Sequence, residues 1–462
     1  MPDKSQMRRL ITLTLIGASF MTGIDLFIVN VAFDQIGRDF STGSLSSLSW
    51  ILNAYAVVFA ALLVPMGRLT DRYGRKSGFV AGLAVFTLAS LMCGFSTNVW
   101  ELVAFRGFQA IGAAAMTPTS LGLLLAALPP ERRAPAARMW ALTSALAAAL
   151  GPAVGGFLVG VSWEWAFWIN VPIGIVLVVA AMRWVPDVRH NQDAPRPDIV
   201  GGVIVALAIG ALVLGIVEGN DWGWSSGRVV GSFIATVVLV GLFAWQTTHH
   251  AAPVIDPALL RVRAFVWADV AAIVFNIGFG IGLLSRILWM QEQWGYGAIR
   301  TGLAVALGPL CVPITSIAVH RVFPRARPGA MIAAGSLCFG LSGVWGGALL
   351  STTPSYWSTF FLPWVLGGVG VGLAMPNLVS GATSDLPAEH ASTGSGVISM
   401  ARQIGMALGI SLLVSIVGSG VPSPDHTRAA WYVLAGSCLL AALAGLAMDA
   451  VRRPVPEVVP IG

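Results

Sequence analysis

Charged residues are scarce in this sequence. Only 10% of its 462 residues are Asp, Glu, Lys or Arg, whereas 56% are hydrophobic. A soluble domain carries roughly 25% charged residues, so a water-soluble protein of this composition would have too few polar side chains to cover its surface. We therefore expect a surface that contacts lipid.

Cysteine and histidine are also few, which excludes several kinds of site. The six histidines fall in loops or at the ends of apolar runs, so they predict no proton relay and no metal site. The four cysteines lie in separate apolar runs, without metal-ligand spacing, and we expect small buried thiols rather than disulfides. They are Cys93, Cys311, Cys338 and Cys438.

A nucleotide-binding loop and a long soluble segment are absent as well. Without them we expect neither an enzyme nor an ATP-driven pump, and no cofactor. The net charge of +6 does not indicate nucleic acid, because the basic residues are spread through short loops. The N-terminal Lys4, Arg8 and Arg9 precede an apolar run that is too long for a signal peptide, so we interpret it as a first membrane span.

Fourteen apolar segments are long enough to cross the roughly 30 Å of hydrocarbon in a bilayer. They are about twice as long as the strands of a membrane barrel, so the sequence predicts an all-α membrane protein. The segments lie near 10–32, 46–66, 77–95, 99–126, 136–160, 165–185, 198–216, 229–247, 265–290, 299–319, 329–350, 355–384, 392–418 and 428–449.

Basic residues predict the orientation of these spans. With the N-terminus in the cytoplasm, the inner segments hold 20 Lys and Arg residues and the outer loops hold 4. This asymmetry satisfies the positive-inside rule. We expect a multi-pass protein with both termini in the cytoplasm. The excess of Arg over Lys, with the abundance of Ala and Gly, suggests a GC-rich bacterial genome and hence a bacterial cytoplasmic (inner) membrane. The four outer residues are Arg38, Arg228, Arg300 and Arg428.

The two ends of the sequence resemble each other. A shift of 258 residues aligns Gly112 with Gly370 and Pro118 with Pro376, and a shift of 253 aligns Gly82 with Gly335. Two halves of six helices in parallel repeat place a transporter's substrate site between them. We expect a six-helix bundle in residues 1–190, two additional spans in 198–250 and a second six-helix bundle in 262–462.

The loop after the second span carries a specific motif, Gly67-Arg-Leu69-Thr-Asp71-Arg72-Tyr-Gly74-Arg75-Lys76. Its glycines permit a tight turn and close helix approach, and Asp71 can cap the next helix or pair with a basic residue. The motif resembles the loop 2–3 signature of the major facilitator superfamily. The resemblance implies a gating role, in which the Asp and Arg side chains latch the two halves together.

The fourth span contains Arg106, about 10 Å into the helix. A charge there must face the bundle interior and have a partner. The stretch Arg106-Gly-Phe-Gln109-Ala110 resembles the family's fourth-span motif, with Ala110 in place of a glycine. The resemblance implies that Arg106 takes part in proton coupling; a purely structural ion pair is the alternative.

The fifth span carries Gly151-Pro152-Ala-Val-Gly155-Gly156. A proline kinks the helix, and small residues four positions apart allow close helix contact. The pattern resembles the antiporter motif that marks exporters within the superfamily. It favours export over proton-coupled uptake of a metabolite, which is the alternative function.

The first span places Asp25 roughly 22 Å from its inner end. A carboxylate near the bilayer centre is costly, and burial favours its neutral form, which suits a group that accepts a proton. The segment resembles the first-span signature of the fourteen-helix drug:proton antiporters, with Phe27 and Asp34 as departures. Ile169-Asn170-Val171-Pro172 resembles the sixth span of the same branch. The resemblance implies proton coupling at Asp25; a structural Asp–Arg pair is the alternative.

Further polar and aromatic residues are candidates for the substrate cavity. Asp269 lies only a few residues inside the ninth span and could simply reach the interface, and Arg286 could extend to the outer surface or bind an anionic group. Trp289 could equally belong to an interfacial belt. The candidates are Asn30, Trp50, Asn53, Gln109, Asp269, Arg286, Trp289, Asn377 and Arg402.

The sequence therefore predicts a major facilitator fold and a secondary active exporter of small amphipathic compounds, such as drugs or antibiotics. We expect the proton gradient to drive it, with Asp25 as the proton site. Its partners would be the substrate and the lipid bilayer. Most members of the superfamily are monomers, and the resemblance implies the same here.

Overall fold

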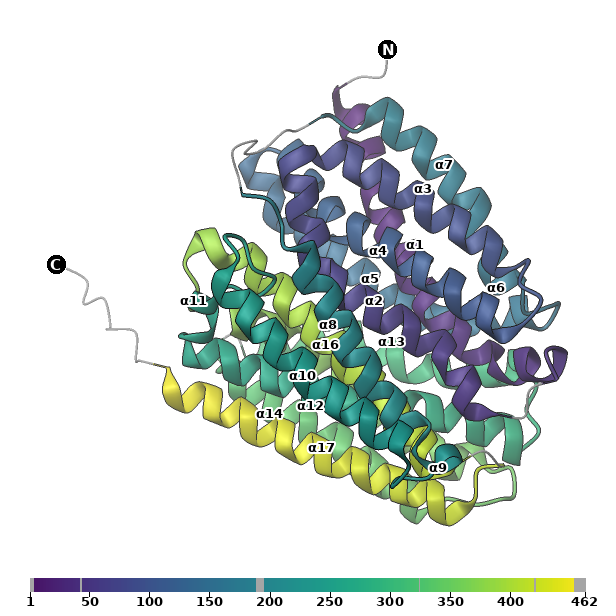
Figure 1. Ribbon diagram of the computed structural model, residues 1–462. Coiled ribbons are helices and arrows are strands. Elements are labelled where there is room, and N and C mark those ends of the chain that lie inside the picture. Colours follow the sequence, from purple (N-terminus) through teal and green to yellow (C-terminus); the bar gives the residue numbers. More distant parts are fainter. Residues whose placement is uncertain (1–3, 42–43, 188–194, 324, 419–420, 453–462) are drawn as a thin grey trace.

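The computed structural model describes residues 4–41, 44–187, 195–323, 325–418 and 421–452. The described chain is helical and contains no strands (Figure 1). The first bundle consists of α1 (Lys4–Asp39), α2 (Leu45–Tyr73), α3 (Arg75–Cys93), α4 (Val99–Ala127), α5 (Pro130–Val159), α6 (Trp165–Trp168) and α7 (Asn170–Trp184).

Three helices follow between the bundles, α8 (Ile199–Val217), α9 (Gly219–Trp222) and α10 (Gly227–His249). The second bundle begins after the short α11 (Pro257–Leu260). It consists of α12 (Arg263–Leu288) with its π-helical end η1 (Trp289–Gln293), α13 (Ala298–Val322), α14 (Pro328–Ala348), η2 (Trp357–Phe361) leading into α15 (Leu362–Thr383), α16 (Ala388–Val417) and α17 (Pro424–Val451). This arrangement confirms the predicted fold.

Thirteen helices in the described ranges are long and apolar enough to span a membrane. Each matches one predicted span, and most extend beyond it because polar residues continue the helix past the hydrocarbon. The remaining predicted span, 136–160, lies within α5, whose apolar part Leu146–Val159 is shorter than the others. The chain is therefore a multi-pass membrane protein.

Short polar side chains begin four helices at the predicted outer end. The side chains of Ser44, Asn98, Ser226 and Ser423 each accept a hydrogen bond from a backbone N–H three residues later. A helix N-terminus leaves several N–H groups without partners, and these caps satisfy one of them. They fix where α2, α4, α10 and α17 begin.

Glycine contacts show the internal repeat in three dimensions. Gly82 of α3 packs so tightly on α4 that a Cβ atom there would lie 2.8 Å from the carbonyl oxygen of Gly112. The aligned pair in the second half does the same, because a Cβ on Gly335 of α14 would lie 2.5 Å from the carbonyl oxygen of Gly370 on α15. The two halves thus share one way of packing helices, which requires glycine at these positions.

The two bundles meet along two seams. One joins α5 to α13 and the other joins α2 to α16. The repeat relates the two seams, because α13 corresponds to α2 and α16 corresponds to α5. Each seam therefore pairs the second helix of one half with the fifth helix of the other.

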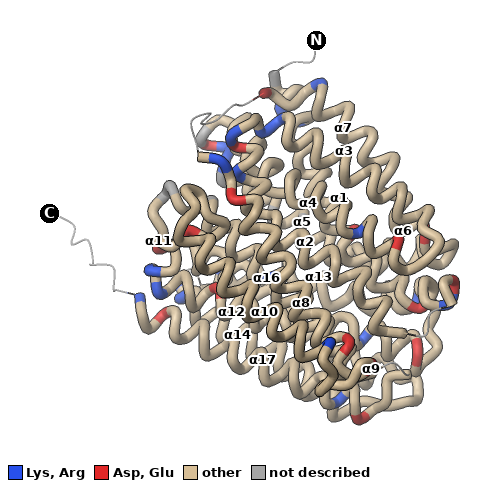
Figure 2. Tube along the Cα trace, viewed as in Figure 1, with Lys and Arg blue, Asp and Glu red and all other residues tan. Residues whose placement is uncertain are grey.

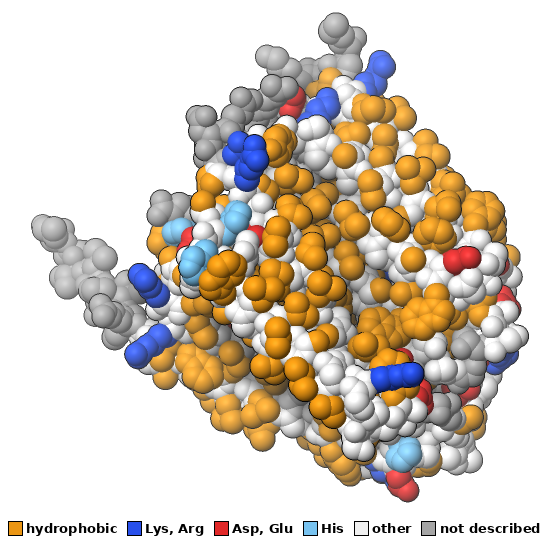
Figure 3. All heavy atoms as spheres, in the orientation of Figure 1, with side chains coloured by type: hydrophobic (Ala, Val, Ile, Leu, Met, Phe, Trp, Pro, Cys, Tyr) orange, Lys and Arg blue, Asp and Glu red, His pale blue; other side chains and the backbone are white. Residues whose placement is uncertain are grey.

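The inserted helix α8 covers only the α2–α16 seam. It packs against both seam helices, in a buried apolar cluster to which α2 contributes Ala56 and Val57, α8 contributes Val213, and α16 contributes Ala407 and Val414. α10 packs on α8 and is otherwise largely exposed. Side chains of α8 and α10 form part of the apolar face in Figure 3, as expected for helices that contact lipid.

Polar contacts attach the inserted segment to both halves at the predicted outer end and to α2 at the other end. At the predicted outer end, Ser46 Oγ of α2 donates to Asp221 at 2.9 Å, and Asn220 donates to the carbonyl of Ser415 on α16. At the other end, Arg68 of α2 donates to the carbonyl of Pro253. The inserted segment therefore bridges the halves at the outer end and, through the apolar cluster of α8, within the seam.

Charged residues gather at the ends of the helices and leave the middle largely free of charge (Figure 2). Many of the basic ones lie near the two chain ends. This distribution fits hydrocarbon around the middle of the helices, since a charge facing lipid there would be costly. The orientation of the chain across the membrane stays a prediction.

Two glycines of α8 offer a matched test of its packing. A Cβ on Gly202 would lie 3.2 Å from the carbonyl oxygen of Ala61 and 3.1 Å from Pro65 Cγ, whereas one on Gly210 would meet nothing within 4 Å. Gly202→Leu should overpack the contact with α2 and destabilise the protein by about 1–3 kcal/mol. Gly210→Leu should be neutral. Thermal unfolding in detergent measures both, and equal effects would contradict this packing.

Candidate functional site

Asp25 lies inside the first bundle and forms a salt bridge with Arg106. The Arg106 Nη1 atom of α4 is 2.7 Å from the Asp25 Oδ2 atom of α1, and both side chains are 0% exposed. Such a pair is stable in a membrane interior only when the charges neutralise each other and the other polar atoms find partners. The partner that the sequence required for Arg106 is therefore Asp25.

Amides and a hydroxyl complete the surroundings of the carboxylate. Gln109 Nε2 and Asn170 Nδ2 each donate to Asp25 Oδ1 at 2.8 Å. Gln109 also donates to Ser90 Oγ of α3 at 2.6 Å. We call these five buried residues the Asp25 cluster: Asp25, Ser90, Arg106, Gln109 and Asn170. Both carboxylate oxygens accept hydrogen bonds, so the charged form is well solvated by the protein.

Arg106 also contacts α2. Its Nε atom donates to the carbonyl of Ile51 at 3.3 Å, and its guanidinium carbon lies 4.2 Å from the centroid of the Tyr55 ring. A guanidinium is attracted to the face of an aromatic ring. Its Nη2 atom is buried and has no hydrogen-bond partner among the described residues. Arg106 thus connects α4 to α1 on one side and to α2 on the other.

Sequence reasoning identified part of this cluster. Gln109 was expected to line the substrate cavity, but it lies in the Asp25 cluster inside one bundle. Asn170 lies in a motif that the sequence analysis noted, and its amide in an apolar run was a usable signal. Ser90 and Tyr55 were missed, because a single Ser or Tyr in a membrane helix is common and gives no indication of its partners.

The predicted gating loop forms a tight link between α2 and α3. Gly74 ends α2 with a φ of 121°, a conformation that favours glycine. A Cβ on Gly67 would be 3.5 Å from Pro118 of α4, an ordinary van der Waals distance, so the packing at this position does not require glycine. Asp71 Oδ1 lies 2.6 Å from Arg75 Nε, one turn later, and Arg72 lies over the ring of Tyr73. In this conformation Asp71 is paired within its own half.

The antiporter motif lies between two helices. A Cβ on Gly151 would be 2.6 Å from Phe27 Cβ, and one on Gly155 would be 3.1 Å from Ile28 Cα, both on α1 next to Asp25. A Cβ on Gly156 would be 2.5 Å from the carbonyl oxygen of Ala298 on α13. The carbonyl of Pro152 faces Gly302 of α13 just as closely. One face of α5 thus supports the helix of Asp25, and another closes the seam with the second half.

Three predicted cavity asparagines have different surroundings. Asn53 of α2 donates to Ser411 Oγ of α16 at 3.3 Å, across the seam between the halves. Asn30 and Asn377 instead donate to carbonyls of their own helices. Trp50, one turn before Asn53, has its indole near the carboxyl group of Glu218 at the end of α8. Asn53 is therefore the one of these that connects the two halves.

Arg286 does not reach the surface, contrary to one of the two predictions for it. Arg286 is 1% exposed, and its guanidinium carbon lies 4.7 Å from the centroid of the Trp364 ring and 4.9 Å from that of the Trp431 ring. The repeat shift of 258 residues aligns Trp364 with Arg106. At this position the fourth helix of the first half carries the cation Arg106. The fourth helix of the second half, α15, carries the Trp364 indole, which contacts the cation Arg286 of α12.

The remaining candidates also lie in the second half. Trp289 is 0% exposed and donates to the carbonyl of Ser351, so it is neither interfacial nor open to a cavity. Asp269 Oδ1 and Arg402 Nε are buried without hydrogen-bond partners among the described residues. Within those residues, no group of three His, Cys, Asp or Glu side chains could hold a metal ion.

Comparisons with known proteins agree with this architecture. The model of the Major Facilitator Superfamily matches residues 15–410. The Multidrug resistance protein Stp of Mycobacterium tuberculosis is 32% identical over 89% of this chain and 77% of its own length. The Tetracenomycin C resistance and export protein of Streptomyces glaucescens is 30% identical over 87% and 74%.

Solved structures share the fold. The crystal structure of an auto inhibited POT family peptide transporter superposes with a TM-score of 0.69 at 15% identity, over 98% of this chain and 99% of that one. At this identity the likeness concerns the fold alone. Together with the match to the family model and the relatives of 30% identity or more, it leads to the conclusion that this chain belongs to the Major Facilitator Superfamily.

Proposed function

We propose that this chain is a secondary active exporter of small amphipathic compounds, including antibiotics, and that the proton gradient drives it. It would act in a bacterial cytoplasmic membrane as a monomer, with both termini in the cytoplasm, and need no bound cofactor. The observation that carries the proposal is the fully buried Asp25 cluster, because it places one ionisable carboxylate against one cation inside a transporter bundle.

Protonation of Asp25 would act on Arg106. A neutral carboxyl group no longer balances the guanidinium, and breaking a buried pair costs about 3–5 kcal/mol. Arg106 would then shift toward the partners it already contacts, the side-chain oxygen of Gln109 and the carbonyl of Ile51. Protonation of a residue on α1 would thereby change the contact between α4 and α2.

The helix α2 connects this change to the seam between the halves. Ile51 and Tyr55, which contact Arg106, lie one turn apart on the same helix. Between them lies Asn53, which donates to Ser411 of α16. A shift of Arg106 therefore alters the helix that holds one seam together. Rocking of two halves around a central site is the general mechanism of such transporters.

Export is favoured over uptake by two observations. The relatives are named for resistance or export, and the antiporter motif forms a glycine contact at the predicted outer end of the α5–α13 seam. We infer that this contact closes the outer end while substrate enters from the cytoplasmic side. Proton-coupled uptake of a metabolite would reverse the direction of substrate movement.

Substitutions in the charge pair test the coupling. Asp25→Asn leaves Arg106 buried without a counter-charge, so we expect lower stability and no transport driven by a pH gradient. The double variant Asp25→Asn with Arg106→Gln should recover stability, because neither charge is left alone, but should still lack coupled transport. Thermal unfolding and substrate flux in proteoliposomes measure the two effects. Normal coupled transport by the double variant would mean that the pair is only structural.

Substitution of a motif glycine tests the closure of the seam. Gly156→Val would push against the backbone of α13, so we expect transport to fall at least tenfold while the bundles stay folded. Gly107→Val on α4 is the control, since a Cβ there meets nothing within 4 Å. If both variants transport at the wild-type rate in the same vesicles, the glycine contact is not needed for the cycle.

Expression in a pump-deficient bacterium tests the direction of transport and the class of substrate. We expect resistance to some members of a panel of toxic cations, tetracycline-like compounds and hydrophobic antibiotics, with lower cellular accumulation of those compounds. The Asp25→Asn, Arg106→Gln double variant should abolish the resistance. Higher accumulation in cells that carry the wild-type protein would favour uptake.

A further inference from the structure

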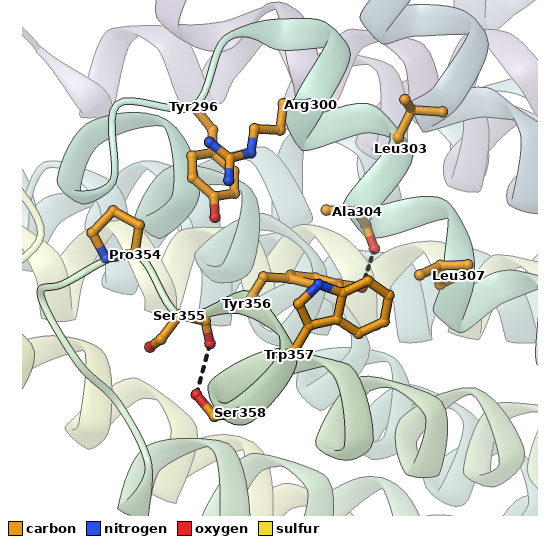
Figure 4. A pocket seen from close by; sticks show the side chains of 10 residues that line it. All are labelled: Tyr296, Arg300, Leu303, Ala304, Leu307, Pro354, Ser355, Tyr356, Trp357 and Ser358. Carbon is orange, nitrogen blue, oxygen red and sulfur yellow. Dashed lines mark hydrogen bonds between the residues drawn. The ribbon is translucent and has the colours of Figure 1, made fainter.

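A hollow lies at the predicted outer end of α13, on the side away from the first bundle (Figure 4). Its volume is about 490 Å³. Tyr296 and Arg300 form one wall, and Ser355 and Trp357, at the start of η2, form the other. Tyr356 donates to the carbonyl of Ala304 and closes the floor between them.

The polar part of the hollow carries one cation. Arg300 is exposed, and its guanidinium carbon lies 3.7 Å from the centroid of the Tyr296 ring. None of the ion pairs among the described residues includes Arg300. Its N–H groups are thus available to a ligand, and the planar guanidinium matches the oxygens of a phosphate group. The Ser355 and Ser358 hydroxyls on the opposite side already donate to the carbonyls of Thr353 and Ser355, so Arg300 is the group that would hold an anion.

An apolar stripe leads from the hollow toward the middle of the membrane. It recurs at the spacing of one helix face on α13, where Leu303 is 49%, Leu310 38%, Ile314 68% and Ile317 44% exposed, with Leu307 at the floor of the hollow. From 303 to 317 the helix rises roughly 21 Å. This length exceeds half of the roughly 30 Å hydrocarbon core, so the stripe covers the full depth of one leaflet.

The position of Arg300 at the outer end of the apolar stripe indicates which kind of ligand fits the hollow. An anionic head group would meet Arg300, and an acyl chain would follow Leu303 and Leu307 toward the middle of the membrane. Trp357, beside the hollow, is 69% exposed. Tryptophan is enriched at the boundary between hydrocarbon and water, so we expect the head-group region of the membrane at this level. Charge and apolar length together match a membrane lipid, because the stripe faces the bilayer along its whole length.

The same turn of α13 closes the seam to the first half. Arg300 points into the hollow, whereas Ile299 packs against Gly160 and the carbonyl of Ala298 against Gly156, both on α5. A ligand bound to Arg300 would therefore contact the same turn of α13 that packs against α5. This turn has to separate from α5 when the outer end opens. The α5–α13 seam has no inserted helix over it, unlike the α2–α16 seam.

We propose that this hollow binds an anionic phospholipid of the leaflet at the predicted outer end, with its phosphate on Arg300 and an acyl chain along the α13 stripe. The bound lipid holds the outer turn of α13 in place against α5. The binding site is independent of the proposed function; only the effect on the transport rate rests on it.

Phosphatidylglycerol is the probe that tests the site. Its binding to the purified protein, followed by native mass spectrometry and by thermal stabilisation in detergent, should weaken about fivefold in Arg300→Gln, the effect expected of one Arg at a membrane surface. Arg228→Gln is the matched control, since Arg228 is also an exposed outer arginine, stacked on Trp222. It should bind like the wild type.

Three outcomes would overturn the site. They are unchanged binding in Arg300→Gln, an equal loss in Arg228→Gln, which would mean general surface attraction, and displacement of the lipid by a transported compound, which would make the hollow a substrate site. As a second readout, phosphatidylglycerol added to phosphatidylcholine vesicles should change the transport rate of the wild type and of Arg228→Gln, but not of Arg300→Gln. A protein that binds the lipid without transporting would contradict the proposed function alone.

Discussion

The buried pair of Asp25 and Arg106 constrains the whole first bundle. Two opposite charges inside a membrane protein are tolerated only at contact distance and with their remaining polar atoms occupied. Five helices contribute to meeting this requirement, since α1, α3, α4 and α7 supply the cluster and α2 supplies a carbonyl and an aromatic face. The glycines of α5 that pack against α1 keep the carboxylate in position. Much of the bundle is thus arranged around one ion pair.

The second half has the same packing and different chemistry. Its glycine contact between α14 and α15 repeats that between α3 and α4. Yet the position that matches Arg106 is Trp364, and the buried cation there, Arg286, rests on indole faces rather than on a carboxylate. The repeat therefore preserved the helix contacts, which depend on small residues, while the charges changed. Among the described residues, the fully buried carboxylate–guanidinium pair lies in the first half, whereas the buried Asp269 carboxylate of the second half has no such partner.

The two seams between the halves also differ in the helices and contacts that surround them. The α2–α16 seam has α8 behind it and polar contacts at each end, so movement there must carry the inserted helices along. The α5–α13 seam has backbone contacts through glycine and no inserted helix over it. Glycine contacts involve few side chains, so they separate without rearranging a core. Because of the inserted helices α8 and α10, movement at the α2–α16 seam involves more of the protein than movement at the α5–α13 seam.

The sequence by itself determined the spans, the inserted pair and the residues that carry charge into the membrane. It could do so because a bilayer obliges each spanning segment to satisfy its backbone within one helix, which makes hydropathy and charge local signals. Only the tertiary structure decided which side chains meet. Asn170 reaches Asp25 across 145 residues of sequence, Gln109 joins the ion pair instead of a cavity, and Arg286 turns inward onto two indoles. These outcomes depend on how each helix is rotated and packed against its neighbours, and apolar helices allow many such rotations with the same hydropathy.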